Sequence, residues 1–278
     1  MDPASLLEQQ RYGLWLDGRE GLHTDADALT FMDEVGLALR YGAAKELPLA
    51  SLYRATQRQA PLAEPEIEAQ PRAFALGNAL LASTQVVETN LVAGRLSLAH
   101  ARLMPAIYAL RRGRREPALS EMASAAFAVI REHDAASGGD VRRALGFTGQ
   151  PRPDAVDEAL AELQRELLVD RGPAGDPGQG VFYLSREGYP YRVFGQAHPE
   201  IVAAATQLTR EQAAVHLLAG YLAAAVFAFP RKLASMFQLL LSREDIDRTL
   251  ESLVRDGRGV RLRIGKMEAV AFSARGII

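Results

Sequence analysis

The stretch SREDIDRTLESLVRDGRGVRLRIGKMEAVAF, residues 242–272, decides the fold because it predicts a helix followed directly by a β-hairpin. Ser242 is a typical helix N-cap, and apolar residues recur after it at helical spacing. Residues 260–264 then alternate between apolar and polar side chains, and 269–272 form a second strand-like run. The Gly265-Lys266 dipeptide between the two runs is typical of a two-residue hairpin turn.

The same order of elements is predicted twice. Helices at about 209–229 and 231–239 precede the stretch above, so the last block has three helices and a hairpin. In the block before it, the predicted helices cover about 119–133, 140–145 and 155–168, and the strand-like runs are 167–169 and 181–184. This is the order of a winged helix, a helix-turn-helix motif followed by a β-hairpin wing. A repeated unit is a stronger indication than any single element. The alternative is two unrelated helical stretches with chance hairpins.

The first block has predicted helices but no convincing wing. These helices cover about 29–41, 47–56, 74–92 and 97–110. The predicted fold class is therefore mainly α, built from tandem winged-helix units. The predicted organisation is an N-terminal segment at 1–24, a first helical or winged-helix-like block at 25–116, and winged helices at 117–195 and 196–278.

Composition excludes several classes of protein. The 278 residues include no cysteine, which removes thiol nucleophiles, cysteine-ligated zinc and iron–sulfur clusters. The 47 alanines favour helix. The 29 arginines against 3 lysines reflect either genomic base composition or a preference for the side chain that binds phosphate and guanine in a fork. Composition alone does not separate these two interpretations.

One apolar segment requires comparison with a membrane span. Residues 213–229 carry no charge apart from a protonatable His216, and 17 residues are at the short limit for a span. The segment is mostly alanine, and Pro230-Arg231-Lys232 follows it at once. We therefore predict a buried core helix. No targeting segment is visible at the N-terminus, so the predicted location is the cytoplasm, with nucleoid association if the source is bacterial.

Charge is segregated along the chain, although its formal net value is only −2. The third helix of each repeated block is rich in Asp and Glu and would repel DNA phosphates, which disfavours base reading by these helices. Basic residues gather elsewhere. The predicted DNA-binding residues are Arg111, Arg112, Arg114, Arg115, Arg142, Arg143, Arg258, Arg261, Arg263 and Lys266. If these clusters converge, they line a channel that follows phosphates; the alternative is solvated surface charge.

Four segments carry a resemblance to a known family. They are ALTFMDEVG at 28–36, ELPLASLY at 46–53, RLMPAIYAL at 102–110 and ALAELQREL at 159–167. With them, the chain over about 25–270 resembles the YcaQ/AlkZ-type winged-helix DNA glycosylase superfamily, and it looks most like the AlkZ-related branch. The resemblance implies release of alkylated or crosslinked bases from DNA that is held in a basic concave channel. It also implies a catalytic Gln-x-Gln or Gln-x-Asp near the first winged helix.

The catalytic residues stay unassigned. Gln57-Arg58-Gln59 has the family spacing but lies in a Pro- and Glu-rich stretch, so we interpret it as a chance match. The stretch at 74–80, FALGNAL, stands where the branch has Trp-x-Trp-Lys-Asp-Glu-Leu and lacks its tryptophans and charges. Asp33-Glu34 is an adjacent acid pair for which a capping or surface role is favoured over a lone general base. Whether the chain is an enzyme is therefore left open.

The remaining candidates are weaker. Tyr12 and Trp15 could stack on a base, but an anchoring role for the N-terminal segment is favoured. The five histidines lack the spacing of metal ligands, so no metal and no cofactor are expected. The predicted function is DNA binding through an Arg-lined channel, in DNA repair or the damage response. The predicted partner is duplex or damaged DNA, and no membrane is expected. The alternative is a protein-interaction scaffold or transcription regulator without catalytic activity.

Overall fold

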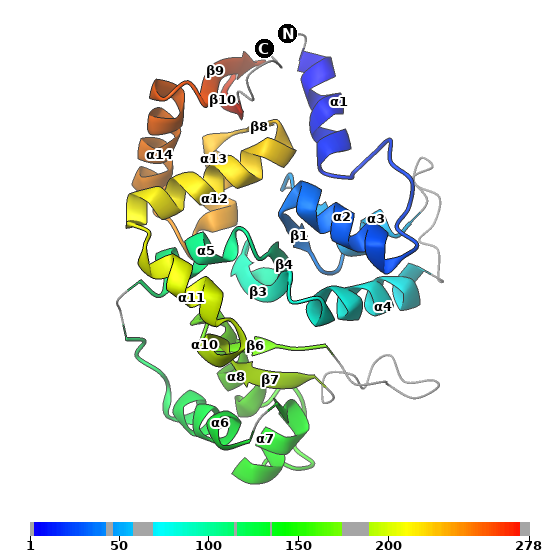
Figure 1. The fold of residues 1–278 in the computed structure, drawn as a ribbon, viewed down its shortest axis with the longest axis vertical. Helices are drawn as coiled ribbons and strands as arrows, with labels where there is room; N and C mark the ends of the chain where they lie inside the picture. Colours follow the sequence, from blue (N-terminus) through cyan, green and yellow to red (C-terminus); the bar gives the residue numbers. More distant parts are fainter. Residues whose placement is uncertain are drawn as a thin grey trace.

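The computed structural model describes residues 3–42, 47–57, 69–113, 116–133, 135–173 and 189–272. The fold is mainly α, as the sequence predicts, with three small sheets in the described residues. Figure 1 shows the first block in the middle of the molecule. The second block lies at one end, and the third block lies at the other, beside the N-terminal helix.

The first block contains a sheet that the sequence did not indicate. Its elements are α2 (Asp25–Val35), β1 (Leu37–Leu39), β2 (Ala50–Ser51), α3 (Leu52–Ala55), α4 (Ala69–Ala82), β3 (Val86–Val92), β4 (Arg95–His100) and α5 (Met104–Arg111). The sheet order is β2-β1-β4-β3. The helices predicted to run through 92 and to begin at 97 are wrong, because a hairpin turns at Ala93 and Gly94, both with positive φ. Since β3 is buried on nearly its whole length, its residues VVETNLV do not alternate between apolar and polar, and without that alternation the segment is ambiguous between helix and strand.

The second block follows the predicted order closely. Its elements are α6 (Glu121–Glu132), β5 (Ala136–Ser137), α7 (Gly138–Leu145), α8 (Ala155–Arg165), β6 (Val169–Arg171) and β7 (Pro190–Val193). The last strand thus lies beyond the run expected at 181–184, which falls outside the described residues. The sheet order is β5-β7-β6, so the short first strand pairs with the last one. An apolar core of its own, centred on Ile130, Leu160 and Leu163, holds this block together.

The third block repeats this arrangement. After α10 (Phe194–Ala197) and α11 (Pro199–Thr206) come α12 (Arg210–Ala225), β8 (Phe227–Ala228), α13 (Pro230–Phe237), α14 (Arg243–Arg255), β9 (Gly259–Ile264) and β10 (Met267–Phe272). The sheet order is β8-β10-β9, again with the short strand on the last one. The second and third blocks therefore share the order helix, short strand, helix, helix and two antiparallel strands, with the same strand pairing.

The central helix α12 joins the third block to the first. Leu217, Leu218 and Leu222 are fully buried, which confirms the predicted core helix. The same apolar core includes Ile107 of α5 and Val87 of β3, so the first and third blocks share one interior. In the described part of the chain, no helix combines the length and the apolar character that a bilayer crossing requires.

The N-terminal helix α1 (Pro3–Gly13) packs on the third block. The buried side chain of Gln10 donates from Nε2 to the carbonyl oxygens of Ala225 and Phe227, at 3.1 and 2.7 Å. Leu6 joins a small apolar cluster with Phe227 and Ala271 of that block. The first and last described elements thus meet at one end of the molecule (Figure 1).

Candidate nucleic-acid interface

The hairpin β9–β10 gathers four of the predicted DNA-binding residues. Arg261, Arg263 and Lys266 are exposed on it, and Arg258 is exposed directly before its first strand. The hairpin is set up locally, because Gly257 and Gly265 take positive φ at the end of α14 and at the turn. Alternate residues on a strand share a face, so Arg261 and Arg263 point the same way. Leu262, between them, packs on the apolar cluster of the third block.

Few acids oppose these four cations. Arg261 lies 3.7 Å from Glu251 of α14, and Glu268 is the cross-strand neighbour of Arg263. Within the described residues, Arg258, Arg263 and Lys266 form no ion pair. The hairpin therefore presents exposed cations on two paired strands and their turns, an arrangement suited to contacts with phosphates.

The end of α5 holds a second pair of predicted residues. Arg111 donates to the carbonyl oxygen of Arg165 at 2.8 Å and to Glu166 at 2.5 Å, so its guanidinium joins the first block to the second. Arg112 is half-buried and has no such acidic neighbour in the described residues. Arg114 and Arg115 lie outside the described residues.

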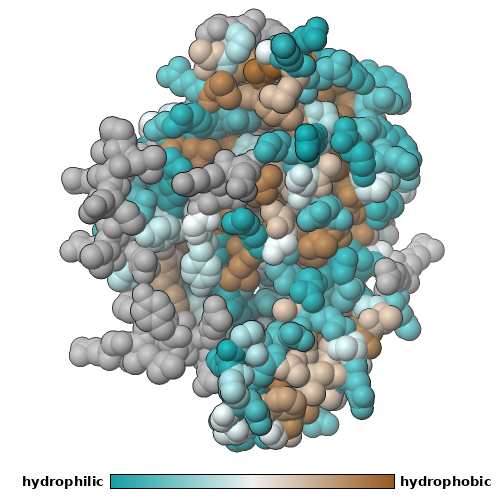
Figure 2. Space-filling model, turned by 180° about the vertical axis from the view of Figure 1, so that it is seen from behind, coloured by the Kyte–Doolittle hydropathy of each residue, from teal (hydrophilic) through white to brown (hydrophobic). Residues whose placement is uncertain are grey.

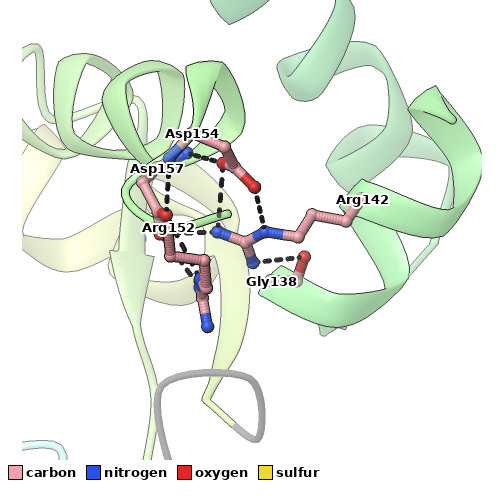
Figure 3. Close-up of polar contacts among 5 residues, drawn as sticks. All are labelled: Gly138, Arg142, Arg152, Asp154 and Asp157. Atoms are coloured by element: carbon pink, nitrogen blue, oxygen red, sulfur yellow. Dashed lines mark hydrogen bonds and ion pairs between the residues drawn. The ribbon is translucent and has the colours of Figure 1, made fainter. Parts of the chain in front are cut away.

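Arg142 and Arg143 lie on α7 in two different environments. Figure 3 shows the Arg142 guanidinium held between Asp154 and Asp157 at the start of α8. Arg142 is 5% exposed, and its Nε lies 2.8 Å from Asp154. These contacts give Arg142 an interior role in positioning α8. Arg143 is exposed and pairs with Asp140 on its own helix at 2.9 Å.

The predicted residues occupy three places. The hairpin and α7 lie at opposite ends of the molecule, with the end of α5 between them (Figure 1). On the face seen from behind, hydrophilic residues cover most of the surface and hydrophobic ones form separate smaller areas (Figure 2). The geometry brings Arg258, Arg261, Arg263 and Lys266 together, and it keeps Arg143 far from them.

Some of the acids of the two third helices bind donors of the same chain, whereas others, such as Asp247 and Glu251, are exposed. In α8, Glu162 accepts hydrogen bonds from the backbone nitrogen and the hydroxyl of Ser120, at 2.8 and 2.7 Å. In α14, Asp245 lies 2.9 Å from Arg210 and also caps the helix. Because these carboxylates are matched by donors of the same chain, they repel an approaching duplex less than the sequence alone indicates.

The two adjacent acids Asp33 and Glu34 bind different partners. Glu34 accepts hydrogen bonds from Trp15 at 3.0 Å and from Arg19 at 2.8 Å, so it fixes the N-terminal segment. Trp15 is 8% exposed, in agreement with the anchoring interpretation rather than base stacking. Asp33 is exposed and lies 2.6 Å from Nη1 of Arg102. Asp33 is thus an open carboxylate beside a cation on the first block.

A buried ionic cluster between the first and second blocks was missed by sequence reasoning. Glu88 of β3 binds Arg40, which directly follows β1, and Arg171 of β6, and Arg40 also donates to Tyr189 at 2.8 Å. Burial raises the pKa of the Tyr189 hydroxyl to about 12, so it stays protonated. The available signal in the sequence was a glutamate between the apolar pairs that begin and end VVETNLV. In the described residues, no group of acids and histidines is arranged to hold a metal ion.

Comparison with known proteins gives one structural match and none at the level of sequence. No family model matches the chain, and no curated protein matches it. The fold is similar to that of the DNA glycosylase AlkZ from Streptomyces sahachiroi, with a TM-score of 0.58 and 11% sequence identity. The similarity covers 96% of this chain and 69% of that one. The predicted YcaQ/AlkZ-type relationship is therefore supported at the level of the fold.

Proposed function

We propose that the protein binds duplex DNA and that the hairpin β9–β10 makes the principal contact. The observation that carries this proposal is the set of four exposed cations on that hairpin, three of them without an ion pair in the described residues. The fold likeness to a DNA glycosylase supports the same class of partner. The same likeness supports the further proposal of a role in DNA repair or the damage response, in the cytoplasm with the chromosome.

We interpret the second and third blocks, 117–195 and 196–278, as tandem winged helices, with β6–β7 and β9–β10 as their wings. The common order of elements and the common pairing of the short strand with the last strand support this interpretation. The first block, 25–116, then acts as the platform that joins them. In this arrangement the wing, rather than the third helix, meets the phosphates, since α14 still carries exposed acids such as Asp247 and Glu251.

Of the remaining predicted residues, we propose that some contact phosphates beside the principal contact at the hairpin. Arg112 and Arg143 would make flanking phosphate contacts, together with Arg111 if a duplex displaces Glu166. Arg114 and Arg115 extend the same basic segment in the sequence. Arg142 is left out of the interface because its guanidinium is buried on Asp154 and Asp157.

The decisive experiment is a titration of the protein onto a fluorescent duplex at several salt concentrations. Phosphate contacts release counterions, so the logarithm of the association constant should fall linearly with the logarithm of salt concentration. A slope that is the same for unrelated duplex sequences supports binding without base reading. Absence of binding at low salt would overturn the proposal and favour a protein-interaction scaffold.

Base excision is the second candidate function, and the open carboxylate of Asp33 favours it. A base-excising enzyme needs a group that positions water or stabilises charge at the sugar. Release of bases from alkylated duplex should be measured for the wild type and for Asp33→Asn. Loss of release in the variant, with duplex binding retained, would assign the reaction to Asp33. No release by the wild type would leave a DNA-binding protein without this activity.

A further inference from the structure

A cavity of about 810 Å³ opens where the end of α5 faces the turn between α11 and α12. Arg111, Arg112 and Gly113 line one side, and residues 206–210 line the other. Its volume lies within the range of small-molecule sites, roughly 300–1,000 Å³. The cavity is separate from the hairpin β9–β10, and none of the residues of that hairpin lines it.

Two of its three arginines are already matched by acceptors. Arg111 is bound to Glu166, as described above. Arg210 donates to the carbonyl oxygen of Leu240 at 3.1 Å and to Asp245 at 2.9 Å. Each of these cations is thus fixed in place and neutralised by one carboxylate.

Arg112 is different. Its Nε and Nη1 atoms are buried and find no hydrogen-bond acceptor among the described residues. A buried donor without an acceptor costs free energy, and a guanidinium carries its charge at any physiological pH. Three arginines against two carboxylates leave one positive charge at the wall of the cavity. The surroundings of Arg112 therefore lack an anion.

The geometry points to a phosphate-binding site in this cavity, with Arg112 as the principal ligand. A guanidinium forms two parallel hydrogen bonds with a phosphate group from Nη2 together with either Nε or Nη1, so one of the two donors that the protein leaves unused would take part in such a fork. The matched Arg111 and Arg210 would add a fixed positive field on either side. The phosphate could belong to a nucleic-acid backbone or to a small phosphate ester, and both present the same chemistry. Arg112 is also a flanking contact in the function proposed above, but the principal contact proposed there, at the hairpin β9–β10, does not depend on this site.

Inorganic phosphate is the probe for the first test, in buffers matched with sodium chloride for ionic strength. At about twenty times its dissociation constant, bound phosphate should raise the Tm of the wild type by about 4–7 °C. Arg112→Gln should lose this rise, and Arg112→Lys should keep only part of it, because an ammonium lacks the planar fork. The matched control is Arg131→Gln, which removes an exposed arginine of α6 away from the cavity.

Two results would overturn the site. One is the absence of any difference in Tm between phosphate and chloride for the wild type. The other is an equal rise in the wild type and Arg112→Gln, since phosphate also stabilises proteins by exclusion from their surface. Calorimetric titration with phosphate gives an independent readout, because heat of binding should be present in the wild type and absent in Arg112→Gln.

A second arm identifies the source of the phosphate. If a duplex oligonucleotide weakens phosphate binding by the wild type, the backbone of a nucleic acid occupies the cavity. If the duplex binds without affecting phosphate binding, a small phosphate ester is the occupant. Failure of Arg112 to bind phosphate would leave duplex binding by the hairpin intact, so this test and that of the proposed function fail independently.

Discussion

Arg171 of β6 donates from Nε and Nη2 to the two carboxylate oxygens of Glu88 on β3, at 2.5 and 2.8 Å. Burial alone would raise the pKa of Glu88, but the charges and hydrogen bonds of Arg171 and Arg40 lower it. Glu88 is therefore ionised in the interior. Because Arg171 belongs to the second block and Glu88 to the first, this ion pair fixes the two blocks to each other.

Glu88→Gln should lower the free energy of unfolding by about 3–5 kcal/mol, since it leaves two buried arginines without a counter-charge. Urea unfolding followed by circular dichroism measures this change. The control is Arg143→Gln, which breaks an exposed pair with Asp140 and should cost less than about 1 kcal/mol. Equal losses in the two variants would show that the Glu88 cluster contributes no more than a surface ion pair.

Asp157 gives the second block a defined response to acid. Burial raises its pKa, but hydrogen bonds from Arg152, from the backbone of Asp154 and from Arg142 outweigh this and lower it from 3.8 to about 2. Because the folded pKa is depressed, the stabilisation is complete above about pH 4 and is lost as the pH falls toward 2. Asp157→Asn should therefore cost about 1–2 kcal/mol at pH 6.

The difference in unfolding free energy between the wild type and Asp157→Asn should narrow as the pH is lowered from 5 to 3. Urea unfolding at half-unit pH steps measures it. Glu158→Gln is the matched control, because Glu158 is the next residue on α8 and is exposed. If the difference in unfolding free energy between the wild type and Asp157→Asn stayed constant down to pH 3, ionisation of Asp157 would not be its cause.

The sequence predicted helices where caps and periodicity agree. Ser242 and Asp154 are both N-caps with complete capping boxes, and the helices that follow them begin where expected. The sequence did not predict the strand β3. Nearly all residues of Val86–Val92 are buried, so the segment lacks the alternation of apolar and polar side chains that marks a half-exposed strand. The local pattern of residues reveals where a helix is capped. It does not reveal which residues are buried by segments that are distant in the sequence.

The candidate site, too, could be predicted from the sequence only where local pattern determines it. The exposed cations of β9–β10 could be predicted, since alternation on a hairpin places Arg261 and Arg263 on one face. The interior place of Arg142 could not, because its acceptors Asp154 and Asp157 reach it only when α7 and α8 pack together. The cluster around Glu88 likewise joins residues that are far apart along the chain.

The packing of α1 on the third block can be tested at Gly13. A Cβ atom at this position would collide with the carbonyl oxygen of Ala224 on α12, and backbone atoms there cannot easily give way. Gly13→Ala should therefore cost about 1–3 kcal/mol in unfolding free energy. It should also speed proteolysis in the segment that follows α1.

Gly195→Ala provides the control for this prediction. A Cβ at Gly195 meets no atom within 4 Å, so the substitution should leave stability unchanged or raise it by up to about 1 kcal/mol. The same urea unfolding measurement serves both variants. If Gly13→Ala were as stable as Gly195→Ala, α1 would not be held against α12 in solution.

The hairpin itself is tested by removing its arginines one at a time. Arg261→Gln and Arg263→Gln should each reduce the slope of log K against log salt for duplex binding by about one unit, and together by about two. Arg263, which has no ion pair in the described residues, should show the larger loss of affinity, because Arg261 is partly neutralised by Glu251 at 3.7 Å. Arg131→Gln lowers the net charge by the same amount but lies on α6 of the second block, so it should leave the slope unchanged. If all three variants shifted the slope equally, the effect would follow net charge and the hairpin would not be the contact surface.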